Sequence, residues 1–195
     1  MPALDLDARA FFAVYGGAGG TWGPAMEVIT LLGSGWSALA LVPMVWHSRT
    51  RRFAAALAIA IAAQAALVWS LKLAVGRVRP WMALGLPEPI GSPHDPSFPS
   101  GHAAGSFCVA VFLTMAIPIA GTGTGSRWLR RLVPMLACLC AALVAISRVY
   151  LGAHFPSDVT VGALLGGLVG GGAAAFYVRP RADTRLAADD RRSPR

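Results

Sequence analysis

Phe53–Val75 reads FAAALAIAIAAQAALVWSLKLAV, and Lys72 is the one charged residue in it. A helix needs about 20 predominantly apolar residues to cross the hydrocarbon core of a bilayer. The stretch meets this length with few polar side chains. It therefore predicts a transmembrane helix.

Four further stretches, one before it and three after it, share this length and apolar character. We expect them to form four more transmembrane helices, at about residues 24–46, 101–120, 132–150 and 157–178. A shorter segment, about Leu6–Tyr15, is expected to lie in the membrane interface as an amphipathic helix. The predicted fold is an all-α integral membrane helical bundle of about five transmembrane helices plus this short N-terminal interfacial helix.

The same interpretation divides the chain into three parts. Residues 1–23 are expected to form an N-terminal interfacial segment, and residues 24–178 a single transmembrane domain. Residues 179–195 are polar and charged, which is typical of a disordered tail.

The composition agrees with a membrane protein. Of the 195 residues, 55% are hydrophobic and 13% are charged, whereas an average soluble domain carries about 25% charged residues. A disordered chain is excluded, and an ordinary soluble globule is disfavoured. Cys108, Cys138 and Cys140 lie in apolar stretches, where side-chain packing is a better interpretation than a disulfide framework or a zinc site.

The net charge of +8 is mainly a topology signal. Arginines gather in three segments, residues 49–52, 127–131 and 179–195, which the predicted helices place on one side of the membrane. Loops rich in Arg face the cytoplasm. The loops at about residues 76–100 and 149–156 are then extracytoplasmic. We expect the protein to have the lipid bilayer, and no nucleic acid, as its partner.

Ionisable residues near membrane depth are costly and by default indicate function. Lys72 and Arg79 are seven residues apart, so on one helix they would face the same way, about 10 Å apart along its axis. Pro80 disfavours a helical conformation for the residue before it, and the helix is expected to end near Arg79. For either cation alone, snorkelling to the lipid headgroups is the simpler interpretation.

The tetrapeptide Pro99-Ser100-Gly101-His102 lies at the start of the transmembrane helix predicted at about residues 101–120. Ser100 suits the N-cap, and Gly101 would let an oxyanion approach the backbone. The free N–H groups of a helix N-terminus form a ready anion site. Simple capping would explain Ser100 but not His102, since histidine is a side chain that can titrate near neutral pH.

Ser147 and Arg148 end the next helix, and His154 and Asp158 follow. Pro156 suits the first turn of the last helix, which would place Asp158 in that turn and His154 just before it. A carboxylate there can orient the imidazole and leave its other nitrogen free as a nucleophile. A favourable contact of Asp158 with the helix dipole is the alternative.

Two histidines, three cations, a carboxylate and a helix N-terminus on one side indicate phosphoryl transfer. The cations would repel a metal ion, and no close pair of metal ligands is evident. We therefore expect a site without metal or other cofactor.

These residues resemble the type-2 phosphatidic acid phosphatase family of integral membrane lipid phosphatases, which shares its site with vanadium haloperoxidases. The family pattern K-x6-RP, PSGH and SR-x5-H-x3-D is present without departure, in order, as KLAVGRVRP, PSGH and SRVYLGAHFPSD. The match covers about Lys72 to Asp158, less than half of the chain. Each part alone is weak, but the three together are strongly specific.

The resemblance implies a role for each motif residue. His154 would be the nucleophile that forms a phosphohistidine, Asp158 would orient it, and His102 would be the general acid. The phosphate would be held by five residues: Lys72, Arg79, Ser100, Gly101 and Arg148. The family works without metal, and its bacterial members of this size act at the outer face of the plasma membrane.

The resemblance leaves the substrate open. We expect a lipid phosphate, with undecaprenyl or another polyprenyl diphosphate favoured and phosphatidylglycerol phosphate or phosphatidic acid as the alternative. A vanadate-dependent haloperoxidase would be soluble, and a non-catalytic lipid-binding protein would not need an intact nucleophile, acid and orienting carboxylate. The oligomeric state stays open.

Three features outside the motifs also suggest a role. His94 and Asp95 are expected in a solvated loop, with a contact to the substrate headgroup as the alternative. Arg77 is a candidate cation behind the site or a headgroup contact. Gly162, Gly166 and Gly170 form a row of small residues that predicts close helix packing, within the fold or between protomers.

Overall fold

The computed structural model describes residues 6–34, 46, 48, 50–89, 94–119 and 128–179. This part of the chain is helical and contains no strand. Its helices, listed in chain order, are α1 (Leu6–Val14), α2 (Gly23–Leu31), α4 (Arg51–Val75), α5 (Pro80–Ala83), α6 (Gly101–Ile119), α7 (Leu129–Tyr150) and α8 (Pro156–Val178).

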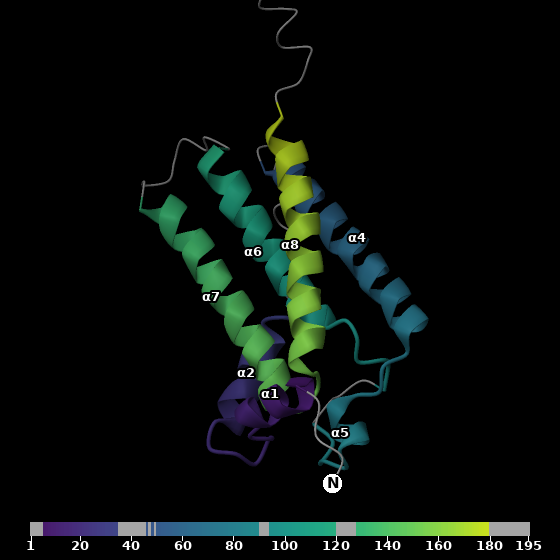
Figure 1. Ribbon diagram of the computed structural model, residues 1–195. Coiled ribbons are helices and arrows are strands. Elements are labelled where there is room, and N and C mark those ends of the chain that lie inside the picture. The colour runs from purple at the N-terminus through teal and green to yellow at the C-terminus, as the bar shows by residue number, and fades with distance from the viewer. Residues whose placement is uncertain are drawn as a thin grey trace, which may run out of the picture.

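The long helices α4, α6, α7 and α8 coincide with four of the predicted spans and lie side by side (Figure 1). Three stretches are long and apolar enough to cross a membrane: Arg51–Ala83, Leu129–Tyr150 and Pro156–Val178. A shorter apolar helix covers Gly101–Ile117. The prediction of an all-α, multi-pass membrane bundle is confirmed, whereas the count of five transmembrane helices is not.

The predicted first span differs from the structure. Helix α2 ends at Leu31 and is followed by hydrogen-bonded turns up to Ser34. Residues 35–45 of that span lie outside the described residues, as does the predicted tail from residue 180 onward.

Helices α6 and α8 approach each other through the glycines of α8. A Cβ atom on Gly162 would lie 2.5 Å from the Ser100 carbonyl oxygen, and Cβ atoms on Gly166 and Gly170 would collide with the α6 backbone. The row of small residues therefore serves packing within the fold. This close contact fixes the first turn of α8 beside the first turn of α6.

The short helices gather at one end of the bundle (Figure 1). Helix α1 packs against α7 and α8, with Phe11 fully buried and its ring 5.6 Å from that of Phe155. Helix α2 packs against α7. The N-terminal segments thus contact the end of the bundle where α4 and α7 finish and α6 and α8 begin.

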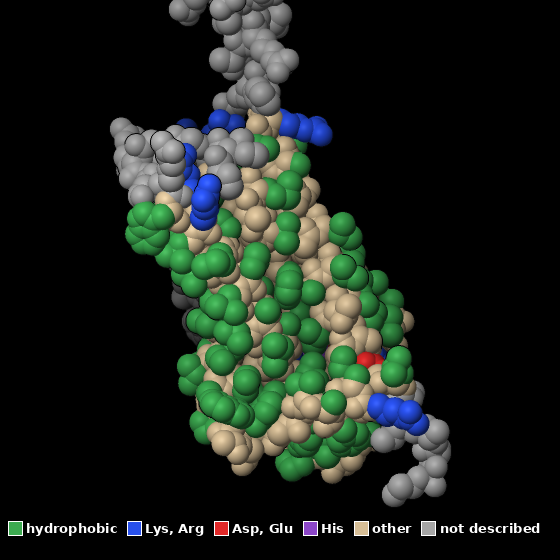
Figure 2. Space-filling model, turned by 60° about the vertical axis from the view of Figure 1, so that its left-hand side comes forward, with side chains coloured by type: hydrophobic (Ala, Val, Ile, Leu, Met, Phe, Trp, Pro, Cys, Tyr) green, Lys and Arg blue, Asp and Glu red, His purple; other side chains and the backbone are tan. Residues whose placement is uncertain are grey.

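The two ends of the bundle differ in charge. Arg51 and Arg52 begin α4, Arg130 and Arg131 lie in the first turn of α7, and Arg179 follows α8. These arginines lie at the end opposite α1. On the face that Figure 2 shows, hydrophobic side chains are spread along the bundle between its two ends. The distribution is that of a bundle whose sides face lipid.

Candidate active site

All eight site residues predicted from the sequence lie at the end of the bundle that carries α1. The end of α4 brings Lys72, the start of α6 brings Gly101 and His102, and the end of α7 brings Arg148. The remaining four, in or beside the connecting loops and the first turn of α8, are Arg79, Ser100, His154 and Asp158.

Helix α4 ends where the apolar stretch was predicted to end, and not near Arg79, where Pro80 was expected to end it. It stops at Val75 because Gly76 adopts the left-handed conformation (φ 62°) and its N–H donates to the Lys72 carbonyl. A glycine in this position commonly ends a helix. Arg79 then lies in extended backbone before Pro80. The prediction that Lys72 and Arg79 share one face of a helix is therefore wrong.

Asp95 brings these two cations together instead. Its Oδ2 lies 2.7 Å from Lys72 Nζ and its Oδ1 lies 2.7 Å from Arg79 Nη2. Lys72 also donates to the Pro96 carbonyl, and Arg79 Nε donates to the Asp95 carbonyl at 2.8 Å. The prediction of a solvated loop is wrong for Asp95, whereas His94 is 74% exposed as expected.

The charge of Asp95 is favoured by its neighbours. Partial burial opposes ionisation, but hydrogen bonds and charges from Lys72 and Arg79 prevail and lower the pKa of Asp95 below its usual range. An ionised carboxylate therefore holds two of the cations that the sequence assigns to phosphate.

His154 lies in the loop before α8 and is 2% exposed. Its Nε2 is 3.4 Å from Arg79 Nη1, which also donates to the Ala153 carbonyl at 3.0 Å. Burial lowers the pKa of His154 to about 3, with Arg148 and Arg79 acting in the same direction and Asp158 against it. The imidazole is therefore neutral at physiological pH and its Nε2 faces a guanidinium.

Ser97 links His154 to Asp158. The Ser97 hydroxyl donates to Asp158 Oδ2 at 2.5 Å, and its oxygen lies 3.4 Å from His154 Nδ1. The direct distance from Nδ1 to Oδ2 is 3.7 Å, which is too long for a hydrogen bond. The carboxylate also accepts the Phe155 N–H at 2.9 Å, so the same group caps α8 and contacts Ser97.

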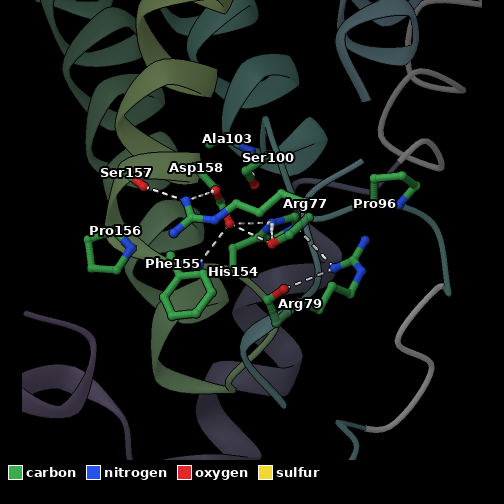
Figure 3. Close-up of polar contacts among 12 residues, drawn as sticks. Arg77, Arg79, Pro96, Ser100, Ala103, His154, Phe155, Pro156, Ser157 and Asp158 are labelled. Atoms are coloured by element: carbon green, nitrogen blue, oxygen red, sulfur yellow. Dashed lines mark hydrogen bonds and ion pairs between the residues drawn. The ribbon is translucent and has the colours of Figure 1, made fainter. Parts of the chain in front are cut away.

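Arg77 holds the other oxygen of Asp158. Its Nη1 donates to Asp158 Oδ1 at 2.6 Å and to Ser157 Oγ at 2.7 Å (Figure 3). Its Nη2 donates to Asp7 Oδ2 of α1 at 2.6 Å. Arg77 therefore contacts the catalytic candidate Asp158. This agrees with the prediction of a cation behind the site, which was one of the two roles that the sequence suggested for Arg77.

Arg148 supplies a third cation that is almost fully buried. Its Nη1 donates to Thr30 Oγ1 of α2 at 2.9 Å, while its Nε has no hydrogen-bond partner within the described structure. A buried donor without a partner is costly, and a bound oxyanion would satisfy it. His102 lies within electrostatic range of Arg148, Arg79 and Lys72, so the two histidines share Arg148 and Arg79 as neighbouring cations.

The start of α6 has the expected cap. The Ala103 N–H donates to Ser100 Oγ in a long hydrogen bond of 3.5 Å, and the Ser100 N–H donates to the Asp158 carbonyl at 3.0 Å. Among the described residues, a Cβ atom on Gly101 would meet only Val68, at 3.8 Å. The backbone at Gly101 is therefore open to the approach of another group.

Four contributors were not assigned to the site from the sequence. Asp95 and Ser97 lie a few residues before PSGH, and this proximity was the available signal. Asp7 and Thr30 are 150 and 118 residues away from their partners Ser157 and Arg148, and no local pattern marks them.

The arrangement suits the binding and transfer of a phosphoryl group. Arg79 and Arg148 act on the neutral imidazole of His154, and Asp95 joins Lys72 to Arg79. Buried cations can neutralise the non-bridging oxygens of a phosphoryl group, and a neutral imidazole can attack phosphorus. No group of three or more His, Cys, Asp or Glu side chains in the described ranges could hold a metal ion.

The chain is similar in sequence to several curated phosphatases. Decaprenylphosphoryl-5-phosphoribose phosphatase of Mycobacterium tuberculosis is 36% identical over 137 residues, 70% of this chain and 68% of that protein. Undecaprenyl-diphosphatase of Sulfolobus acidocaldarius is 35% identical over 121 residues, 60% of this chain and 52% of that protein. The chain spans less than half the length of several other curated relatives that it matches.

A solved structure has the same architecture. The transmembrane PAP2 type phosphatidylglycerolphosphate phosphatase from Bacillus subtilis superposes with a TM-score of 0.73 at 28% identity, over 90% of this chain and 86% of that one. The model of the PAP2 superfamily matches residues 53–182, which include every motif residue described above. The chain belongs to the PAP2 superfamily.

Proposed function

We propose that this protein is a membrane-embedded, metal-independent lipid phosphatase that works through a phosphohistidine. The observation that carries the proposal is the neutral, buried imidazole of His154, whose Nε2 faces Arg79 and whose Nδ1 lies beside the Ser97–Asp158 pair. This leaves one ring nitrogen available for attack while the other is oriented.

In the first step, His154 Nε2 attacks phosphorus and the bond to the leaving oxygen breaks. The Nδ1 proton stays on the ring and is directed to Ser97, which donates to Asp158. Lys72, Arg79 and Arg148 neutralise the three non-bridging oxygens. His102 donates a proton to the leaving oxygen.

In the second step, water attacks the phosphohistidine. His102, now neutral, accepts a proton from that water, and the N–P bond breaks to return His154 to its starting form. The cations stay in place through both steps. Asp95 and Asp158 are themselves paired with Lys or Arg, which supports a role for cations, and not a metal, in charge neutralisation.

The substrate that we propose is a polyprenyl diphosphate such as undecaprenyl diphosphate. Two relatives named for decaprenyl- or undecaprenyl-linked substrates match 70% and 60% of the chain. The alternative is a glycerolipid phosphate, which is supported by the structural neighbour named for phosphatidylglycerolphosphate. In both cases the lipid tail would lie in the bilayer beside the apolar long helices.

We further propose that the site opens at the extracytoplasmic face of the plasma membrane. The arginines at the starts of α4 and α7 and after α8 lie at the opposite end of the bundle from His154. The positive-inside rule assigns that opposite end to the cytoplasm.

A phosphate-release panel in detergent tests the proposal. Undecaprenyl diphosphate, phosphatidylglycerol phosphate and phosphatidic acid are compared for the wild type, His154→Ala and His94→Ala. We expect the wild type and His94→Ala, whose side chain is exposed, to turn over and His154→Ala to be inactive. Undiminished turnover by His154→Ala refutes the assignment, and a strong glycerolipid preference overturns the substrate choice.

A further inference from the structure

Asp7 connects the N-terminal helix α1 to the candidate site over a long stretch of sequence. Its Oδ2 accepts Arg77 Nη2 at 2.6 Å and the Ser157 hydroxyl at 2.5 Å, and its Oδ1 accepts the Ser157 N–H at 3.0 Å. Asp7 thus binds both Arg77 and the first turn of α8, which carries Asp158.

We infer that Asp7 is a positioning residue for the proposed reaction: through Arg77 it holds the Asp158 carboxylate in register with Ser97 and His154. The inference rests on the proposed function and extends it to a helix that carries none of the motifs. Its basis is the unbroken chain of contacts from Asp7 through Arg77 and Asp158 to Ser97.

Arg77 divides its guanidinium between two carboxylates. Nη1 goes to Asp158 Oδ1 and Nη2 goes to Asp7 Oδ2, both at 2.6 Å. Its Cζ also lies 4.3 Å above the centre of the Phe155 ring, which fixes the plane of the group. Because Asp7 occupies Nη2, Arg77 binds Asp158 through one nitrogen and one oxygen.

This single contact leaves the second oxygen of Asp158 for the site. Oδ2 accepts Ser97 Oγ and the Phe155 N–H. Without the Asp7 carboxylate, Arg77 could bind both oxygens of Asp158, since a guanidinium and a carboxylate favour a bidentate pair. Asp158 would then be drawn away from Ser97, and the imidazole would lose its orientation.

Charge leads to the same expectation. Asp158 is fully buried, and Arg77 and Asp7 are partly buried at 28% and 20% side-chain exposure. Asp7 offsets part of the positive charge of Arg77. Removal of that carboxylate makes the surroundings of His154 more positive and its nitrogen a poorer nucleophile.

The variant Asp7→Asn keeps the size of the side chain and removes its charge. We expect kcat for lipid phosphate to fall by about 10- to 100-fold, as for other small misplacements of a reacting group. KM should stay unchanged, since the hydrogen bonds of Asp7 go to Arg77 and Ser157 and not to the cations proposed for phosphate. Arg9→Gln is the control, because Arg9 lies on the same helix and is exposed.

A double-variant comparison separates positioning from stability. If Asp7 acts through Arg77, kcat of Asp7→Asn/Arg77→Gln equals that of Arg77→Gln alone, whereas independent effects multiply. Equal kcat for Asp7→Asn and Arg9→Gln, or a multiplied loss in the double variant, overturns the inference while the proposed function stands. If Arg77→Gln does not fold, the kcat and KM values of Asp7→Asn against Arg9→Gln decide alone. A wild type that releases no phosphate overturns the proposed function, and the inference falls with it.

Discussion

Asp95 Oδ2 forms an ion pair of 2.7 Å with Lys72 Nζ, at the place where the sequence motifs assign a substrate phosphate. The other carboxylate oxygen pairs with Arg79 at the same distance. A substrate phosphate that binds these two cations has to replace Asp95 on them. The Asp95 carboxylate therefore competes with a substrate phosphate for Lys72 and Arg79.

Replacement of Asp95 by Asn is expected to lower both KM and the inhibition constant for vanadate. A hydrogen bond to a charged group contributes about 1.5–3 kcal/mol, so a change on the order of 10-fold is expected. Initial rates at varied substrate and vanadate measure both constants. Glu88→Gln is the control, since Glu88 is exposed in the same loop region. A raised KM in Asp95→Asn would show instead that Asp95 keeps the cations in place for substrate.

Replacement of Ser97 by Ala is expected to lower kcat by at least about 10-fold with little change in KM. The hydroxyl contacts both Asp158 and His154, which are 3.7 Å apart, so its loss leaves them unconnected. Rapid-quench measurement of phosphoenzyme formation checks this step. Ser70→Ala is the matched control, because the Ser70 hydroxyl donates within α4 to the Ala66 carbonyl. Wild-type phosphoenzyme formation in Ser97→Ala would remove Ser97 from the mechanism.

The parts of the fold that the sequence predicted are those determined by local physics. Apolar length located α4, α6, α7 and α8, because each span must be apolar along its whole length to lie in lipid. The difference at the end of α4 is also local: Pro80 predicts an end near Arg79, whereas Gly76 ends the helix first. Gly76, in the left-handed conformation, ends the helix four residues before Pro80.

The sequence motifs predicted which residues gather at the site. The motif residues meet at one end of the bundle, but their connections do not follow from spacing. Asp158 reaches His154 through Ser97, and Arg148 is held by Thr30 from α2. Such contacts depend on how distant helices pack, which a single sequence does not specify.

Acidification is expected to destabilise the protein through His154. Its pKa is about 3 in the folded state, below the ordinary value of about 6.5. Between these values the unfolded chain binds one more proton than the folded chain, so stability falls as pH falls from about 6.5 toward 3. At about pH 4.5 the loss is on the order of 2 kcal/mol.

Thermal unfolding in detergent from about pH 7 to 4.5 measures this loss, with His154→Gln as the comparison. The variant lacks the group, so its melting temperature should fall less steeply with acid than that of the wild type. The lowered pKa values of Asp7 and Asp95 add acid sensitivity at still lower pH in both proteins. Equal slopes for the two proteins contradict a buried neutral imidazole.

The same substitution at three glycines should have three outcomes. Gly166→Ala places a methyl group against the Ala104 backbone of α6, which cannot move without separating the helices. Such overpacking costs about 1–3 kcal/mol, and the melting temperature should fall. Gly172→Ala on the same helix meets no atom of the described residues within 4 Å and should be neutral or stabilising.

In Gly101→Ala the new methyl group lies 3.8 Å from Val68, so the fold should be retained. Its KM should nevertheless rise, because the methyl group occupies the approach of phosphate to the α6 backbone. A Gly101→Ala enzyme with wild-type KM would place the phosphate away from this helix start and restrict the cradle to the three cations.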